Sequence, residues 1–414
     1  MRKRMLVLLL AAAICMGGCG QRPGGTEPAV NMEEDEEQKD SGAEQNRKED
    51  GSDAASEGTD NTEGEDGNIV SGEPASGAEE EKGIVQAKGL AELYQENFPI
   101  GIALSGYILQ NTEQYGQVIL ENFNSITCEN EMKPDSLLDQ AASQANLEDA
   151  YLHAAVHFDN CMPAVKFASE HGMKIRFHTL VWHSQTPKWF FTEDYTDEGR
   201  LVDRDVMLAR MENYIADVLG YFQENYPGLV YAVDVVNEAF DVGDGDETGI
   251  RMNKNLWYET VGADYYYQAF VFARKYASKD MKLFYNDYGC MDKADLILEH
   301  LARAREEGLI DGIGMQSHLS TDDKIQHKFM LAVKKFCDAG YEVQATELDI
   351  GVKEDSDSAF LLQGRKYRSF FKNMKALQEE GYPVTGITVW GLNDDLSWRR
   401  DEKCLLFDGD MNPK

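Results

Sequence analysis

Residues 230–240 read VYAVDVVNEAF. Apart from Asp234, the first seven residues of this stretch are apolar, and most of them are β-branched. A short apolar run of this kind is typical of a strand that is buried on both faces. The run ends in Asn237 and Glu238, an amide and a carboxylate. The stretch therefore predicts a buried parallel strand that carries polar side chains at its carboxyl end.

The same pattern recurs along the chain, and longer helical stretches such as 162–172 and 361–381 lie between the repeats. The expected strands cover residues 100–105, 124–130, 174–183, 230–238, 282–289, 311–319, 342–350 and 386–394. Strands that alternate with helices in this way predict an α/β fold, a (β/α)8 TIM barrel. The alternative is an open doubly wound sheet, which usually has a glycine-rich first turn that this sequence lacks.

Two carboxylates stand out among the polar strand ends. Glu238 ends the fourth expected strand, and Glu347 lies near the end of the seventh. In a TIM barrel the carboxyl ends of the strands meet at one face, where active sites are built. A pair of carboxylic acids is the minimum requirement for glycoside hydrolysis, in which one group must stay protonated and the other ionised. The pair therefore predicts a glycosidase site.

Aromatic residues accompany these carboxylates in polar clusters: Trp182, Tyr288, Trp390 and Trp398. Sugar rings present apolar C–H faces that stack on aromatic rings, while their hydroxyl groups need polar partners. A barrel mouth that offers both kinds of side chain indicates a polysaccharide substrate. Two other tryptophans, Trp189 and Trp257, are expected to be core residues.

One motif belongs to each expected strand from the second to the eighth. The motifs are SITCENEMKPDSL (125–137), RFHTLVWHSQTPKWF (176–190), DVVNEAF (234–240), YNDYG (285–289), GMQSHL (314–319), ATELDI (345–350) and VWGLNDDLSWR (389–399). With these motifs in this order, the chain resembles glycoside hydrolase family 10, the endo-β-1,4-xylanases, from about residue 90 onward. The resemblance implies a retaining endo-β-1,4-xylanase that hydrolyses internal bonds of xylan by double displacement. Two-carboxylate chemistry requires no cofactor, and no metal site is predicted.

The resemblance also implies catalytic roles at the matched positions. Glu238 would be the acid/base that protonates the leaving oxygen, and Glu347 the nucleophile. In a retaining pair the carboxyl groups lie about 5–5.5 Å apart. Asn237 would bind the 2-hydroxyl of the sugar that is cleaved. His318, supported by Asp349, would orient and ionise Glu347. The remaining support residue is Gln316, which would tune the acid/base.

The other residues implied by the resemblance bind substrate. At the reacting subsite these are Lys133, His178 and Trp182. The next sugar would be held by Glu129 and Asn130, under an aromatic wall of Trp390 and Trp398. Supporting or lining positions in the cleft are His183, Gln185 and Tyr288.

The chain begins MRKRMLVLLLAAAICMGGCG, with a basic start, a short apolar run and small residues. This pattern predicts a lipoprotein signal peptide over residues 1–19, with Cys19 as the lipidated residue. A lipid anchor would place the protein outside the cell, tethered to the membrane. The alternative is an ordinary secretory signal that is cut nearby.

Residues 20–83 are acidic and almost free of apolar side chains. Such a segment cannot bury enough surface to fold, so we expect a disordered linker before a catalytic barrel over residues 84–414. We expect the linker to hold the barrel away from the membrane. The alternative is a solvated tail that contributes only solubility.

The 414 residues carry a formal net charge of −34, and this acidity excludes a nucleic-acid partner. The acidic loop 241–249 resembles a calcium loop only loosely, so no metal site is predicted there. Outside the signal the odd number of cysteines, widely spaced, indicates buried thiols rather than a disulfide framework, with one disulfide left open. A monomer is expected.

The sequence ends in LLFDGDMNPK, whereas the family resemblance implies a final barrel helix beyond this point. We expect a barrel without that helix to expose apolar wall and to lose stability, with the mechanism unchanged. Two functional alternatives stay open: a broader β-1,4-glucanase, and a surface glycan-binding lipoprotein of the same fold.

Overall fold

A computed structural model describes residues 88–414. The predicted signal peptide (1–19), the lipidation site Cys19 and the linker (20–83) lie outside the described residues. The strands of the described part are β1 (Ile100–Leu104), β2 (Ser125–Cys128), β3 (Lys174–Trp182), β4 (Val230–Asn237), β5 (Lys282–Asp287), β6 (Gly312–Met315), β7 (His318–Ser320), β8 (Glu342–Gly351) and β9 (Val384–Val389). Its longer helices are α3 (Thr112–Asn122), α7 (Met162–Glu170), α8 (Arg204–Asn225), α10 (Tyr265–Tyr276), α11 (Cys290–Glu306), α12 (Asp323–Asp338) and α13 (Asp357–Glu379).

Shorter helices occupy the connections between these elements. They are α1 (Leu90–Leu93), α2 (Gly106–Gln110), α4 (Pro134–Leu137), α5 (Gln140–Ala145), α6 (Leu147–Ala150), α9 (Leu256–Val261) and the 3-10 helices η1 (Lys188–Phe191), η2 (Asp394–Leu396) and η3 (Arg400–Glu402).

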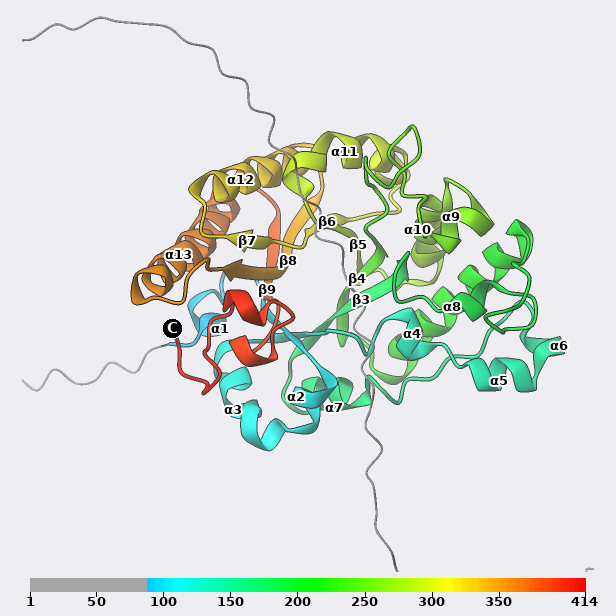
Figure 1. Cartoon of the computed structure of the whole chain (residues 1–414), viewed down its shortest axis with the longest axis horizontal. Helices are drawn as coiled ribbons and strands as arrows, with labels where there is room; N and C mark the ends of the chain where they lie inside the picture. Colours follow the sequence, from blue (N-terminus) through cyan, green and yellow to red (C-terminus); the bar gives the residue numbers. More distant parts are fainter. Residues whose placement is uncertain (1–87) are drawn as a thin grey trace, which may run out of the picture. The chain divides into compact units, whose positions relative to one another are not determined.

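The strands form a closed parallel barrel with helices around it (Figure 1). Strands β1 to β6 pair in chain order, β6 pairs with β8, and β8 pairs with β9. The pairing of β9 with β1 closes the ring. Strand β7 pairs with β8 in a separate short ladder. The eight strands of the ring confirm the predicted (β/α)8 TIM barrel.

One predicted strand is wrong in its extent. The expected strand 311–319 is divided into β6 and β7, with Ser317 between them at a φ of +71°. A non-glycine residue in this left-handed region interrupts a regular strand. The sequence GIGMQSHL alone gave no sign of the bend, because neither glycine nor proline stands at that position.

The helices form where apolar residues recur at helical spacing. Helix α13 buries Tyr367, Phe370, Phe371 and Met374 on one face. It begins earlier than predicted, at a cap where the Ser356 side chain accepts a hydrogen bond from the backbone of Ala359. Both predicted helical stretches, 162–172 and 361–381, correspond to helices, α7 and α13.

A buried ion pair lies inside the barrel below its mouth. The guanidinium of Arg176 on β3 donates two hydrogen bonds to Asp234 on β4, one of them 2.6 Å long, and its Nε donates to Gln344 on β8 at 2.9 Å. The side chains of Arg176 and Asp234 are 1% and 0% exposed. Asp234, the residue that interrupts the apolar run, is therefore neutralised by a partner from the neighbouring strand.

Replacing Arg176 with Met is expected to destabilise the barrel by about 3–5 kcal/mol, because it leaves the Asp234 carboxylate buried without its partner. The measurement is the free energy of unfolding in urea. As a matched control, Arg200→Met removes a surface pair with Glu193, where the arginine side chain is 81% exposed, and should change stability by about 0.5 kcal/mol or less. Equal losses in both variants would contradict this reading of the ion pair.

The segment after β9 contains the 3-10 helices η2 and η3, and no α-helix follows β9 within the described residues. The expectation of an exposed apolar wall is nevertheless wrong for the strands, since Ile100, Ile102 and Ile387 are at most 1% exposed. Apolar exposure is found on helices instead, at Leu361 and Leu93 for example.

Candidate active site

Glu238 follows β4 directly, and its carboxylate lies at the mouth of the barrel. Its two oxygens accept hydrogen bonds from Trp182 Nε1 at 3.0 Å and from Gln316 Nε2 at 2.7 Å. Its backbone has a φ of +55°, and its N–H donates to the carbonyl of Asn286 at 2.9 Å. A glutamate with a backbone in the left-handed region is uncommon and costs free energy, and such residues cluster at functional sites. The bend turns this carboxylate out of the strand toward the mouth.

Glu347 lies on β8, and its side chain is 6% exposed. Its oxygens accept hydrogen bonds from His318 Nε2 at 3.2 Å and from Asn286 Nδ2 at 2.7 Å. Burial alone would raise the pKa of this carboxyl group. The hydrogen bond from His318, the electrostatic effect of the neighbouring imidazoles and the hydrogen bond from Asn286 outweigh burial and lower the pKa to about 2. Glu347 is therefore ionised at neutral pH.

His318 lies between two carboxylates. Its Nδ1 donates to Asp349 at 2.9 Å, and its Nε2 donates to Glu347. Burial lowers the pKa of the imidazole, but the charge of Asp349 and the hydrogen bonds to both carboxylates outweigh it and raise the pKa to about 10. Asp349 also accepts hydrogen bonds from Trp398 Nε1 at 3.1 Å and from the Arg399 guanidinium.

This arrangement makes stability depend on pH in a defined direction. The folded pKa of His318 is raised from 6.5, so its contribution to stability is complete below about pH 6.5 and is lost as pH rises through about 10. The folded pKa of Glu347 is lowered, so its contribution is present above about pH 4.5 and is lost as pH falls through about 2. Urea unfolding of the wild type and His318→Gln at pH 5.5, 7.5 and 9 tests the first statement. The stability difference between the two proteins should shrink as pH rises; a difference that is constant with pH would contradict it.

A second cluster lies beside Trp182. Lys133 Nζ donates to Gln185 at 2.6 Å and to Asn130 at 3.2 Å, and it lies 4.8 Å from the centre of the Trp182 ring. Burial lowers the pKa of Lys133, while nearby carboxylates raise it in part. Glu129 borders this cluster, and burial followed by repulsion from Glu131 raises its pKa to about 7. The cluster offers hydrogen-bond donors and acceptors next to an aromatic ring.

His178 connects the mouth to the buried ion pair. Its Nδ1 lies 2.9 Å from Asp234 Oδ2, and its ring packs edge-on against Trp390 at 5.6 Å. Trp390 is 9% exposed, whereas Trp398 is 61% exposed, with its ring 4.9 Å from that of His318. The two tryptophans predicted as a wall therefore differ, because Trp390 is largely buried and Trp398 presents its ring to solvent.

Tyr288 belongs to a different network, which includes the loop after β4, and His183 lies near Arg251 of this loop. The hydroxyl of Tyr288 donates to Asp241 and accepts from Arg251 at 2.6 Å. Arg251 also donates to the carbonyl of Glu238 at 3.0 Å. Burial and the charge of Arg251 lower the pKa of His183 to about 3, so this imidazole is neutral. Arg251 thereby joins the loop to the residue that carries one of the two carboxylates.

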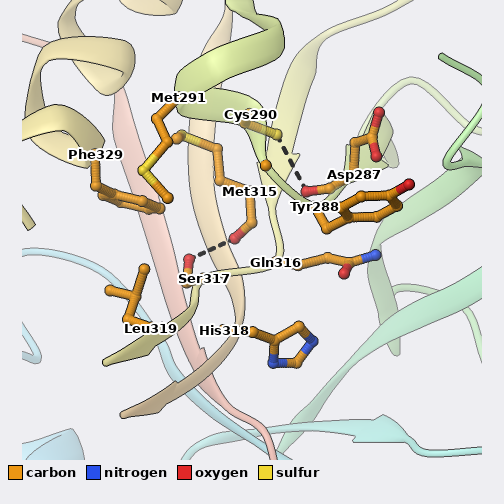
Figure 2. A pocket seen from close by; sticks show the side chains of 11 residues that line it. Asp287, Tyr288, Cys290, Met291, Met315, Gln316, Ser317, His318, Leu319 and Phe329 are labelled. Carbon is orange, nitrogen blue, oxygen red and sulfur yellow. Dashed lines mark hydrogen bonds between the residues drawn. The ribbon is translucent and has the colours of Figure 1, made fainter. Parts of the chain in front are cut away.

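The segment between β6 and β7 lines a cavity of about 40 Å³ with Gln316, Ser317 and His318 (Figure 2). Gln316 and His318 point to one side of this segment, whereas the Ser317 hydroxyl turns away and donates to the carbonyl of Met315 at 2.6 Å. Met291 and Phe329 line the cavity. The bend at Ser317 thus lets two alternate residues face the mouth, where Gln316 contacts Glu238 and His318 contacts Glu347.

At the barrel mouth the predicted site residues form three groups. These are the two carboxylates with their hydrogen-bond partners, the cluster beside Trp182, and the network of Tyr288 and the loop after β4. Sequence reasoning missed Asn286, Arg251 and Arg399, all of which contact predicted residues. Asn286 and Arg399 lie inside motifs that were recognised, YNDYG and VWGLNDDLSWR. Arg251 lies in a polar loop that contains no comparable signal.

Three further features of the described residues concern metals, cysteines and membrane spans. Within residues 88–414 no group of three or more His, Cys, Asp or Glu side chains is placed to hold a metal ion. Asp241 and Asp244 of the acidic loop pair instead with Arg251. The cysteines of this region are buried free thiols, as predicted: Cys128, Cys161, Cys290, Cys337 and Cys404. In the described region no helix has both the length and the apolar character to cross a bilayer.

Comparison with known proteins places this geometry in a family. The profile of glycosyl hydrolase family 10 matches residues 89–414. The chain belongs to glycosyl hydrolase family 10. It is 40% identical to endo-1,4-beta-xylanase B of Butyrivibrio fibrisolvens, over 78% of this chain and 51% of that protein. It is also 40% identical to endo-1,4-beta-xylanase A of Thermotoga maritima, over 81% of this chain and 30% of that protein.

Among solved structures, the family 10 barrel is similar to xylanase 10B of Clostridium thermocellum in complex with xylohexaose. The TM-score is 0.73 and the identity 34%, over 80% of this chain and 67% of that one. This chain spans about half, or less, of the length of the two curated relatives described above.

Proposed function

We propose that this family 10 protein is a retaining endo-β-1,4-xylanase that acts on xylan and xylo-oligosaccharides. The observation that carries the proposal is the difference between the two carboxylates. Glu347 is buried and held ionised by His318 and Asn286, whereas Glu238 is bound by the neutral donors Trp182 and Gln316. Two carboxylates in such different surroundings suit the separate roles of nucleophile and acid/base.

In the proposed first step, an oxygen of Glu347 attacks the anomeric carbon and forms the glycosyl-enzyme. At the same time Glu238 gives its proton to the glycosidic oxygen, so that the bond to the leaving sugar breaks. In the second step Glu238 takes a proton from water, whose oxygen attacks the anomeric carbon and releases Glu347. Asn237 binds the 2-hydroxyl of the reacting sugar, and Gln316 keeps Glu238 in position.

The proposed subsites follow the clusters at the mouth. Lys133, His178 and Trp182 bind the reacting sugar, and Glu129 and Asn130 bind the next one. Gln185 accepts a hydrogen bond from Lys133 and so holds this lysine in place. The walls of the cleft are Trp390 and Trp398 on one side, with Tyr288 and His183 toward the loop after β4. An exposed Trp398 ring offers an apolar face to a sugar.

The test is the release of reducing sugars from xylan, mixed-linkage β-glucan and carboxymethyl cellulose by the purified protein. Release mainly from xylan supports the proposal. Equal release from the glucans would favour the broader β-1,4-glucanase. A folded protein that binds xylan in a pull-down without cleaving it would favour the glycan-binding alternative.

We also propose that the protein is an extracellular monomer anchored to the membrane through a lipid on Cys19, with residues 20–83 as a spacer. The support is the basic, apolar and small-residue order of the first 20 residues. Cys19→Ala is expected to move the protein from the membrane fraction to the soluble fraction, because the residue that carries the lipid is removed. Cys290→Ala, which alters a buried thiol of the barrel, is the matched control. An unchanged membrane fraction in Cys19→Ala would contradict the anchor.

A further inference from the structure

Asn286 is buried between the two halves of the site. It lies on β5 with an exposure of 0%, and in the sheet it is the register partner of Asn237 on β4 and of Gly314 on β6. Its Nδ2 donates to Asn237 Oδ1 at 2.9 Å and to Glu347 Oε1 at 2.7 Å. Its backbone carbonyl accepts the N–H of Glu238 at 2.9 Å. One residue thus contacts the proposed nucleophile, the proposed acid/base and the proposed ligand of the 2-hydroxyl.

The Asn286 side chain can reach Glu347 because the residue that it passes on β6, Gly314, has no side chain. Glu347 lies on β8, and β6 stands between β5 and β8 in the ring. Asn286 crosses β6 at Gly314, where a Cβ would lie 2.5 Å from Asn286 Oδ1. On the far side the hydroxyl of Thr346 on β8 donates to the same oxygen at 2.6 Å. The glycine provides the space, and the threonine holds the amide in place.

In the series of hydrogen bonds from Glu347 through Asn286 to Asn237, each contact determines which atom of the next residue donates and which accepts. An ionised carboxylate only accepts hydrogen bonds, so the Asn286 atom that faces Glu347 must be its Nδ2. The second hydrogen of that nitrogen points at Asn237, which must therefore present its Oδ1. The Nδ2 of Asn237 is then the atom left to face the substrate, and it can only donate. A side chain at position 286 that could only accept hydrogen bonds would not impose this orientation on Asn237.

We propose that Asn286 is a positioning residue that couples the carboxylate of Glu347 to the orientation of Asn237, so that Asn237 always presents a donor to the 2-hydroxyl of the sugar. The coupling rests on the proposed function, since it assigns the sugar to the free side of Asn237. It explains why a fully buried amide stands between two residues that act on the same ring. It also predicts that a substitution at Asn286 changes how much the 2-hydroxyl of the sugar contributes to kcat/KM.

The test combines a variant with a modified substrate. The wild type and Asn286→Ala are assayed on an aryl β-xylobioside and on its analogue without the 2-hydroxyl of the ring at the scissile bond. In the wild type the missing hydroxyl should lower kcat/KM on the order of 100-fold, because its contact strengthens in the transition state. In Asn286→Ala the same omission should cost about tenfold less than in the wild type, because Asn237 no longer presents a fixed donor.

Two further variants keep the proposal testable if Asn286→Ala folds poorly. Thr346→Val removes only the hydroxyl that holds the amide and should reduce the loss caused by the missing 2-hydroxyl in the same direction. Asn124→Ala is the matched control, since the Asn124 side chain accepts a hydrogen bond from the backbone of Ile100 at 2.9 Å and has no contact with either glutamate. It should leave the effect of the 2-hydroxyl unchanged.

The coupling would be overturned if omission of the 2-hydroxyl lowered kcat/KM by the same factor, within about twofold, in the wild type, Asn286→Ala and Thr346→Val. That result is distinct from failure of the proposed function, in which the wild type would cleave neither glycoside. A second readout is the acidic limb of the kcat/KM profile. Loss of a donor to Glu347 should shift this limb to higher pH in Asn286→Ala, whereas a purely structural role would leave it in place.

Discussion

Replacing Glu347 with Ala is expected to lower kcat/KM on xylan by about 10⁴-fold or more. The variant retains the binding residues but has no oxygen that can form the glycosyl-enzyme. The loss should be similar for xylan and for activated aryl xylosides, because both need the same attack. Initial rates on both substrates measure it, with circular dichroism to show that the barrel is folded.

The matched control is Glu342→Ala on the same strand. Glu342 begins β8 and pairs with Lys282 at 2.5 Å, far from the carboxyl end where Glu347 lies. A partly exposed pair of this kind contributes about 1 kcal/mol or less, so activity and stability should both remain close to the wild type. If Glu347→Ala kept ordinary xylan turnover while folded, the assignment of the nucleophile would be wrong.

Replacing Glu238 with Ala is expected to separate substrates by their leaving groups. Turnover of xylan should fall by about 10³-fold, within the range that general acid catalysis contributes, because the departing sugar oxygen needs a proton. The first step on an aryl xyloside with an acidic phenol should be slowed far less, because this leaving group departs without protonation. Burst kinetics on the aryl substrate measure the two steps separately.

The pH profile gives an independent readout for the same variant. In the wild type the alkaline limb of kcat/KM reports ionisation of the acid/base, so this limb should disappear in Glu238→Ala. The structural control is Gln316→Ala, which removes a 2.7 Å donor to Glu238 but leaves the carboxyl group in place. It should shift the limb without abolishing it. Equal loss on xylan and on the aryl xyloside in Glu238→Ala would contradict the acid role.

The core of the proposed site was predictable because its residues stand in local motifs. Asn237 and Glu238 end an apolar strand, and the barrel rule places such ends at the mouth. The same reasoning reached Glu347, near the end of its expected strand, and the family resemblance added His318. It failed for Arg251, because a polar loop without periodicity does not indicate which residue it approaches. It also failed at Ser317, where the backbone bends without a glycine.

The sequence by itself determined the barrel, its family and the types of side chain at its mouth, because strand periodicity and short motifs are local properties of the chain. The tertiary structure decided which of these side chains touch. Asn286 and Glu347 are separated by 61 positions, and they meet only because β6 carries Gly314 where the amide must cross. The orientation of Asn237 follows from that contact, and the ionisation of Glu347 depends on His318 together with it. Both depend on the register of strands in the closed ring, which no single motif contains.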